Sequence, residues 1–437
     1  MEVVPRKRRP YSTLEKLEMK KTLVALAALA SVTAFAQSSV TITGLVDMNY
    51  GSVTAPKNAV LLSTGNVSRV AHNGDATTAI ILQATDDIGG GLTAAFRYEI
   101  NPDFVAGTGL TGGVGVGGTA TSAATAAATT ITNTAYGTGA NGYNFIGITS
   151  KDLGGIKLGR LNTGTLAAWG DGSVFGTALG SGYGSSAIYA RYGSSSANYN
   201  NTAPTRFNNA VEYQSPAMNS FTVRYLFAPK VDVTGVGGEN GCTASSTCTL
   251  ENTQVPGANR AGVSDLSVRY SNGPLNASYA IQQISSGTGD TNALVNPALQ
   301  STSSAKINHK TMAANYTSGN ITGYVAYWSL THLTAVAASE INDKGNMFGI
   351  KYTMGNIELK ASQAKLNSSL TGALALQADR KVTGFGADYN LSKKTKIYAR
   401  LENRNADVNG TVTAAGSVTS TQGATTKTTA VGFRTNF

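Results

Sequence analysis

A tight turn leads into a regularly alternating segment at residues 354–362, which read Met354-Gly355-Asn356-Ile357-Glu358-Leu359-Lys360-Ala361-Ser362. The Gly-Asn pair has the chemistry of a hairpin turn. After the turn, apolar side chains occupy every second position, and charged or polar side chains occupy the positions between them. Successive side chains of a β-strand point to opposite faces of its sheet, so the segment predicts a strand with one apolar and one polar face.

The same alternation recurs in residues 92–99, 221–227 and 396–402. Together the polar faces of these segments carry charges of both signs, which are too costly to bury unpaired and indicate a wetted surface. Both ends of the region, residues 40–47 and 431–437, alternate in the same way. The first and last strands are therefore available to pair with each other.

Short and long connections alternate between the predicted strands. Seven tight turns of Gly, Asn, Asp and Pro chemistry are expected at residues 86–90, 151–154, 215–219, 271–274, 317–319, 354–356 and 390–393. Eight long polar connections are expected at about residues 53–75, 101–141, 162–205, 229–261, 285–307, 333–344, 367–378 and 405–427. Fifteen connections join sixteen strands, with short links at one end and long links at the other. A soluble β-sandwich or solenoid has no reason to sort its connections by length.

Composition agrees with a membrane β-barrel. The chain has 437 residues with 50 Gly, 41% hydrophobic and 13% charged residues, whereas average usage supplies about 30 Gly. Beyond the N-terminus no run of roughly 18 apolar residues is present, which excludes a helical membrane protein. In hydrocarbon a sheet pairs all its backbone groups only by closing on itself. We therefore expect an all-β fold, a 16-stranded antiparallel transmembrane β-barrel over residues 37–437.

The N-terminus has the pattern of a secretory signal peptide. Met19-Lys20-Lys21 precedes an apolar run at Leu23–Leu29 and the small-x-small site Ala34-Phe35-Ala36. We expect residues 1–36 to form the signal region, with cleavage after Ala36. The mature chain then has 27 Lys and Arg against 21 Asp and Glu, a formal charge of +6.

Residues 1–18 fit poorly ahead of such a signal, and translation from Met19 would explain them. The alternatives are a long basic extension of the signal or a nucleic-acid-binding arm. Cys242 and Cys248 enclose five residues of a Gly- and Thr-rich stretch, which suits a small loop disulfide in an oxidising compartment. A metal site is disfavoured because His72, His309 and His332 are far apart in sequence.

Several motifs in family order resemble Gram-negative porins of the Neisseria and Burkholderia type. The motifs lie along the whole predicted mature chain. Each one alone is a weak indication of the family, and together they are specific for it. They are Ser38-Ser39-Val40-Thr41-Ile42-Thr43-Gly44-Leu45-Val46-Asp47, Asp86-Asp87-Ile88-Gly89-Gly90-Gly91-Leu92, Lys157-Leu158-Gly159-Arg160, Arg206-Phe207-Asn208-Asn209-Ala210-Val211-Glu212-Tyr213-Gln214-Ser215-Pro216 and Val431-Gly432-Phe433-Arg434-Thr435-Asn436-Phe437.

The resemblance implies a homotrimeric channel in outer-membrane lipid, with short periplasmic turns and long outer loops, through which small hydrophilic solutes and inorganic ions diffuse passively. It also implies that the third long loop, residues 162–205, folds into the pore, and that Phe437 is read as an assembly signal. The chain departs from the family pattern in two ways: Asp171 is the only acidic residue of that loop, and residues 142–147 contain no arginine. The family's constriction residues therefore cannot be carried over as a set.

Basic residues on the polar strand faces are the candidates for lining the pore. They are Arg97, Arg224, Arg269, Lys351, Lys360, Arg400 and Arg434. Arg160 and Arg206 flank the third loop. Arg206 is an even number of residues from Glu212 and so falls on the same polar face of its strand, which suits the lumen. Arg160 falls on the same face as the apolar Leu158, so it needs a bulge or the start of the loop to reach the lumen. Lumenal charges bias the entry of ions of opposite sign, so we expect weak anion selectivity. Alternatively, neighbouring acids such as Glu99, Asp265, Glu358 and Glu402 neutralise the basic residues.

Signatures of an enzyme are sparse. Gly107-Thr108-Gly109-Leu110-Thr111-Gly112 matches a dinucleotide-binding pattern, but more Gly, Ala and Thr follow it where a helix is required. Asp86-Asp87 lies in a turn. We therefore expect no catalytic residue, cofactor, resident metal or nucleic-acid partner. A barrel enzyme and an adhesin with recognition loops remain as alternatives.

Overall fold

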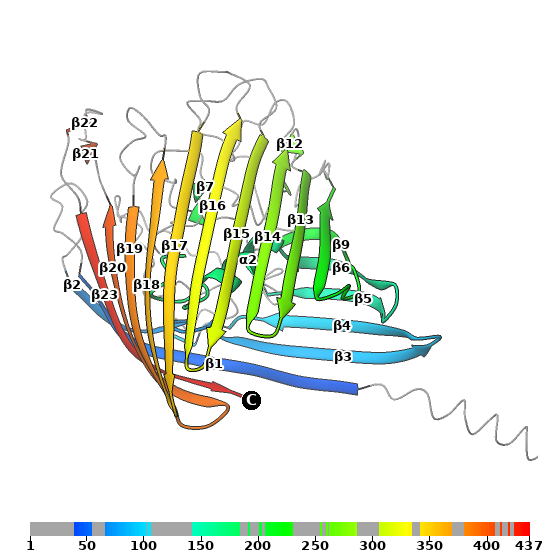
Figure 1. Ribbon diagram of the computed structural model, residues 1–437, viewed down its shortest axis with the longest axis horizontal. Coiled ribbons are helices and arrows are strands. Elements are labelled where there is room, and N and C mark those ends of the chain that lie inside the picture. Colours follow the sequence, from blue (N-terminus) through cyan, green and yellow to red (C-terminus); the bar gives the residue numbers. More distant parts are fainter. Residues whose placement is uncertain are drawn as a thin grey trace, which may run out of the picture.

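The computed structural model of the chain places the alternating segments in one antiparallel sheet (Figure 1). The structure describes residues 39–54, 66–102, 104–105, 142–183, 191–192, 201–202, 206–229, 254–255, 259–260, 262–285, 306–333, 341–368, 380–406, 411–412, 418–419 and 424–437. The sheet's strands are β1 (Ser39–Thr54), β2 (Asn66–His72), β3 (Ala79–Gly89), β4 (Leu92–Ile100), β5 (Asn144–Ser150), β6 (Gly154–Asn162), β9 (Arg206–Gln214), β10 (Phe221–Ala228), β13 (Gly262–Asn272), β14 (Leu275–Ser285), β15 (Lys306–Ser318), β16 (Ile321–Leu333), β17 (Ile341–Met354), β18 (Ile357–Ser368), β19 (Arg380–Asn390), β20 (Thr395–Ala406) and β23 (Ala424–Asn436).

The sheet closes into a barrel because β1 pairs with β23 on one side and with β2 and β3 on the other. Strands β2 and β3 lie end to end opposite β1, separated by residues 73–78, so the closed sheet has sixteen strand positions. This confirms the predicted 16-stranded antiparallel barrel. The last residue takes part in the closure: the Phe437 amide donates to the Gly44 carbonyl oxygen at 3.0 Å, and the Gly44 amide donates to the Phe437 oxygen at 3.3 Å.

The seven expected tight turns join consecutive strands at one end of the barrel (Figure 1). Most residues of the expected long connections lie outside the described residues. The first long connection differs from the prediction of residues 53–75. Strand β1 continues to Thr54 and β2 begins at Asn66, so residues 66–72 belong to the wall. Residues 73–78 then leave the strand, because turn-forming Asn73-Gly74 interrupts the alternation.

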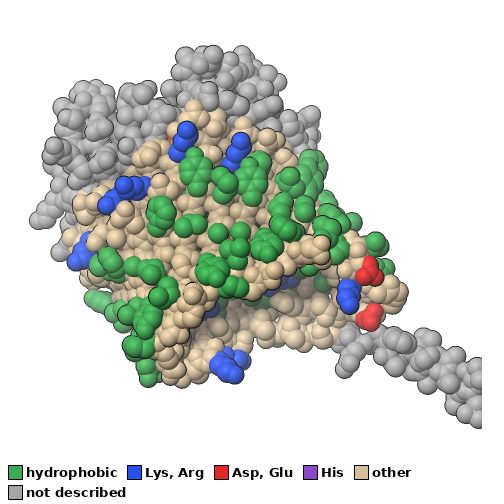
Figure 2. Space-filling view, viewed as in Figure 1, with side chains coloured by type: hydrophobic (Ala, Val, Ile, Leu, Met, Phe, Trp, Pro, Cys, Tyr) green, Lys and Arg blue, Asp and Glu red, His purple; other side chains and the backbone are tan. Residues whose placement is uncertain are grey.

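The two faces of the sheet differ as the alternation predicts. In β17, Phe348 on the outer face is 62% exposed, whereas its neighbour Met347 is completely buried. Exposed apolar side chains spread across the outer face of the wall that Figure 2 shows. Such a surface is stable only against an apolar medium. In the described residues, no helix is long and apolar enough to cross a membrane.

Helix α2 (Gly164–Gly172) lies inside the barrel and packs against β13–β17 (Figure 1). The interior core forms around it, with Trp169 against Trp328 of the wall at a ring distance of 5.2 Å. The remaining described strands, β7 (Arg191–Tyr192), β8 (Asn201–Thr202), β11 (Gln254–Val255), β12 (Asn259–Arg260), β21 (Thr411–Val412) and β22 (Val418–Thr419), pair outside the main sheet. Cys242, Cys248 and the glycine motif at residues 107–112 lie outside the described residues.

Candidate functional site

The third loop enters the barrel through a capped helix. Thr163 is the N-cap of α2, and its hydroxyl accepts a hydrogen bond from the Leu166 amide at 3.2 Å. The carboxylate of Asp265 on β13 accepts from the Gly164 amide at 2.9 Å and the Thr165 amide at 3.5 Å. A carboxylate at a helix N-terminus also interacts favourably with the helix dipole. Asp265 therefore anchors the start of the loop, and its carboxylate also acts electrostatically on Arg224.

The far end of the loop is tied to the opposite part of the wall. Glu402 of β20 accepts from the Gly180 amide at 2.9 Å and the Gly182 amide at 3.2 Å. The Ser362 hydroxyl donates to the Gly180 carbonyl oxygen at 2.9 Å. Gly384 permits this approach, because a Cβ there would collide with the Gly180 carbonyl. The described part of the loop is thus fixed at both ends.

Asp171 lies in the middle of this loop and binds Arg269 of β13 with both carboxylate oxygens, at 2.8 and 2.9 Å. The Ser278 hydroxyl also donates to it, and the Asn315 amide group donates to its carbonyl oxygen at 2.8 Å. A bidentate Arg–carboxylate pair is directional and strong. The only acid of the predicted loop is therefore paired to the wall, which leaves its charge compensated.

One group of charges, the β17–β23 cluster, lines the inner wall below the loop. Its basic members are Lys351, Lys360, Lys396, Arg400 and Arg434, and its acidic members are Asp75, Glu358 and Asp388. Arg434 lies 2.9 Å from Asp75, and Lys360 lies 2.7 Å from Asp388. Five basic side chains share three acids, so the cluster has an excess of two positive charges.

Asp75 reaches this cluster because residues 73–78 fold into the barrel. The buried carboxylate of Asp47 accepts from the Asp75 amide at 2.6 Å and the Ala76 amide at 2.7 Å, and the Tyr398 hydroxyl donates to its other oxygen. The Asn73 amide donates to the Asp47 carbonyl oxygen at 3.2 Å. These hydrogen bonds to Asp47 hold residues 73–78 in the conformation that places Asp75 inside the barrel. Sequence reasoning missed Asp75 by assigning it to an outer loop; the Asn-Gly-Asp run was the available signal.

A second group, the β4–β10 cluster, lies on another part of the inner wall. It contains Arg97, Lys157, Arg206 and Arg224 around Glu99 and Glu212. Arg97 is 2.6 Å and Arg206 is 3.9 Å from Glu99, and Lys157 is 3.1 Å from Glu212. Four basic side chains are ion-paired with these two acids, and Asp265 also acts on Arg224, so the cluster has more basic than acidic side chains. Lys157 was not among the predicted residues, although it alternates with the exposed Ile156 and Leu158.

Comparison with known proteins gives the same picture as the geometry. The sequence pattern of the Gram-negative porin family matches residues 22–410. The chain belongs to the Gram-negative porin family. It is therefore a β-barrel channel protein of the outer membrane, with many membrane-spanning strands.

Individual relatives of this porin are more distant. It is 45% identical over 82 residues to outer membrane porin protein 32 of Delftia acidovorans, a stretch spanning 18% of this chain and 22% of that relative. The fold is similar to that of the anion-selective porin from Comamonas acidovorans, with a TM-score of 0.64, 21% identity and coverage of 92% and 100% of the two chains. OmpT of Vibrio cholerae gives a TM-score of 0.54, 13% identity and coverage of 92% and 98%.

Arg160 of the porin lies near the end of β6 beside the third loop, and its route to the lumen stays a prediction. It pairs in register with Asn144, in line with the pairs Ile146–Leu158 and Ile148–Ile156 that face outward. A register shift lies between Gly159 and Leu161, with the extra residue in β9, so Arg160 keeps the parity of Leu158. Beyond the shift Arg206 lies opposite Asn162 and does not keep the predicted parity with Glu212, although its guanidinium still lies 3.9 Å from Glu99. The Arg160 guanidinium donates to Asn208 at 2.8 Å.

In most ion pairs of the porin wall, the basic partner is more exposed than the acidic partner. The Arg269 side chain is 50% exposed against 11% for Asp171, and Arg434 is 25% exposed against 7% for Asp75. The same order holds for Lys157 and Glu212, 19% against 1%. Two side chains depart from it: Arg400 is completely buried beside Asp388, and Lys360 is less exposed than Glu358, 9% against 22%. In most of these pairs the basic side chain therefore contacts water more than its acidic partner does.

Proposed function

We propose that this porin forms a water-filled channel for passive diffusion of small hydrophilic solutes and ions, and that anions pass more readily than cations. The observation that carries the proposal is the unequal exposure of the lumenal ion pairs. Carboxylates buried behind the bases act on a passing ion from farther away, and Coulomb energy falls with distance. Each of the two clusters also has more basic than acidic side chains. Both effects make the wall attractive to anions.

The porin from Comamonas acidovorans is named as anion-selective, and that name supports the same selectivity here. We propose that the residues responsible include Arg97, Arg206, Arg224, Arg269, Arg400 and Arg434, together with the lysines of the two clusters. Asp171 contributes by holding Arg269 next to the loop. Arg400 acts indirectly, because it is buried and positions Asp75 and Asp388.

The test replaces two accessible bases, Lys351 and Arg434, by glutamine. The zero-current potential of the purified porin across a salt gradient should shift toward weaker anion preference. The matched control is Lys393→Gln with Lys394→Gln, which removes the same charge from an exposed turn between β19 and β20. A cation preference in the unmodified porin, or equal shifts in test and control, would refute the proposed selectivity.

We also propose that the porin has no enzymatic activity, that it assembles as a homotrimer and that residues 1–36 are removed on export. In the part of the chain that the structure describes, no group of three or more His, Cys, Asp or Glu side chains could hold a metal ion. One structure of Vibrio cholerae OmpT is described as a trimer form, which supports the assembly. The mass of the detergent-extracted complex tests the trimer.

A further inference from the structure

The excursion of residues 73–78 interrupts the barrel wall between β2 and β3. Two residues of β1, Val46 and Asp47, stand opposite these six residues of the neighbouring chain. Six residues against two leave four in excess, which must leave the plane of the sheet. They turn into the lumen, where Asp75 is ion-paired with Arg400. A segment inside a pore places its charge beside the path of the ions.

Thr78 closes the base of the excursion. Its hydroxyl accepts a hydrogen bond from the Asp47 amide at 3.1 Å and donates to the Asp47 carbonyl oxygen at 3.3 Å. A continuous strand would have supplied the partners of these two backbone groups, which cannot stay unpaired in a membrane. The Thr78 amide donates to the side-chain oxygen of Asn73 at 2.7 Å, and this bond joins the two ends of the excursion.

The side chains of Asp47 and Tyr398 hold the middle of the excursion. The Tyr398 hydroxyl donates to the carboxylate that also accepts from the Asp75 and Ala76 amides. Gly74 packs directly against this hydroxyl, because a Cβ there would lie 2.5 Å from the hydroxyl oxygen. The excursion therefore has no room to move toward the wall while these bonds are intact.

The other side of the excursion contacts the third loop. The Leu179 amide donates to the Gly74 carbonyl oxygen at 3.2 Å. The next residue of the loop, Gly180, donates its own amide to Glu402 on the wall. The excursion thus lies between the wall and the loop and is hydrogen-bonded to both.

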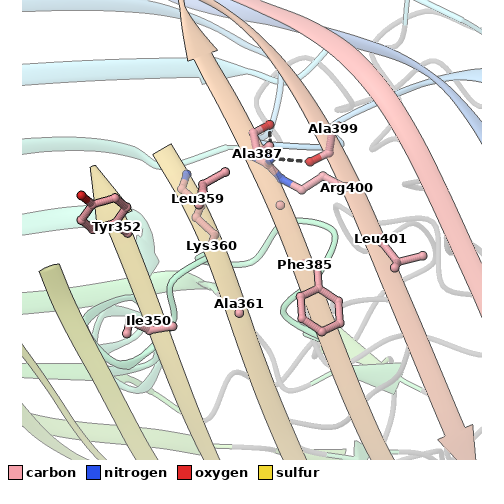
Figure 3. Close-up of a pocket in the computed structure, with 11 residues that line it drawn as sticks. Ile350, Tyr352, Leu359, Lys360, Ala361, Phe385, Ala387, Ala399, Arg400 and Leu401 are labelled. Atoms are coloured by element: carbon pink, nitrogen blue, oxygen red, sulfur yellow. Dashed lines mark hydrogen bonds between the residues drawn. The ribbon is translucent and has the colours of Figure 1, made fainter. Parts of the chain in front are cut away.

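Arg400 connects the same three parts. Its guanidinium donates to the backbone carbonyl oxygens of Ala387 and Ala399 in the wall, at 3.4 and 2.9 Å (Figure 3). It is also paired with Asp75 of the excursion, and it lies 5.5 Å from the centre of the Phe175 ring of the third loop. The position of Asp75 therefore depends on the excursion and on a base that is itself fixed to the wall.

Lys396 and Arg434 also pair with Asp75, at 2.5 and 2.9 Å. Burial raises the pKa of Asp75, but Arg400 and these two bases lower it more, so its pKa lies well below the usual range. The carboxylate is therefore charged at neutral pH. Moving it away from its bases would change the charge that faces the pore by one unit, although the net charge of the chain would stay the same.

We propose that Asp47, Thr78 and Tyr398 are positioning residues for ion selectivity, because they hold the excursion in the pore and so keep Asp75 among its bases. This role rests on the proposed selectivity, and it adds buried residues that act without contacting the ions. The excursion is then a second inner element of the pore, beside the third loop.

The test measures the zero-current potential across a potassium chloride gradient for Thr78→Val and Tyr398→Phe, which remove hydroxyl groups but no charge. Both should raise the ratio of anion to cation permeability by about twofold to fivefold, up to the effect of Asp75→Asn at low ionic strength. Thr78→Ser keeps the hydroxyl and should leave the ratio unchanged. The matched controls should also leave it unchanged: Thr317→Val loses a hydroxyl hydrogen bond at the turn between β15 and β16, and Tyr327→Phe loses an exposed hydroxyl.

Double variants separate positioning from a general effect on the barrel. In the Asp75→Asn background, Thr78→Val and Tyr398→Phe should each change the ratio no further, because the charge that they displace is already absent. Additive rises would show that the hydroxyls act elsewhere in the pore and would overturn the inference. Unchanged ratios in both neutral single variants, in channels of normal conductance, would overturn it as well. A cation preference of the unmodified porin would count against the proposed selectivity alone, since this test compares variants with each other.

Discussion

Replacing Asp75 by asparagine is expected to strengthen the preference for anions. Asp75 is the carboxylate surrounded by Lys396, Arg400 and Arg434, and it reaches the lumen only through the excursion at residues 73–78. Asparagine keeps the shape of the side chain and removes its charge. The excess of basic side chains in the β17–β23 cluster then rises from two to three.

The magnitude follows from Coulomb's law. A unit charge acts on an ion about 8 Å away across water with about 0.5 kcal/mol, which changes the local ion concentration by about twofold to threefold. The effect has the opposite sign for a cation. The ratio of anion to cation permeability should therefore rise about fivefold at low ionic strength, and less as salt screens the wall.

The measurement is the zero-current potential of the purified porin across a potassium chloride gradient, at two ionic strengths. Asp152→Asn is the control, because Asp152 is exposed in the turn between β5 and β6 and loses the same charge away from the lumen. An unchanged or smaller permeability ratio in an Asp75→Asn channel of normal conductance would refute the reasoning.

Three further predictions concern assembly, the loop and processing. Deleting Phe437 should impair assembly more than deleting residues 112–130, because both backbone groups of Phe437 bond to Gly44 at the closure; equal yields of heat-modifiable trimer on gels would contradict this. Gly384→Val should lower single-channel conductance, because the new side chain would push the third loop off the wall into the lumen; normal conductance would show that the loop moves elsewhere. The mature protein should begin at Gln37 by intact mass, and a mature form that keeps upstream residues would sink this prediction.

Local sequence pattern was enough to predict the wall. Alternation such as that of Ile357, Leu359 and Ala361 is a local property, and each face of a strand meets a single environment. Turn chemistry is equally local, as at Gly355-Asn356. The sixteen strands and their tight turns could therefore be predicted without knowing which strands are neighbours. Closure followed from the need to pair every backbone group in hydrocarbon.

The charge partners depend on contacts between distant residues and could not be predicted in the same way. Neutralisation of lumenal bases by Asp265 and Glu402 was the alternative interpretation of the sequence, and the sequence did not predict that these acids also hold the third loop. Asp75 was assigned to an outer connection, although it lies among bases more than 300 residues away in sequence.

The anchored third loop also has a mechanical consequence. A hollow cylinder resists lateral pressure poorly, because its wall can flatten without stretching. Here the segment from Thr163 to Gly182 spans the interior and is fastened to β13 through Asp265 and to β20 through Glu402. It therefore acts as a cross-brace, so that squeezing by the surrounding bilayer is opposed by hydrogen bonds in the interior as well as by the curvature of the sheet.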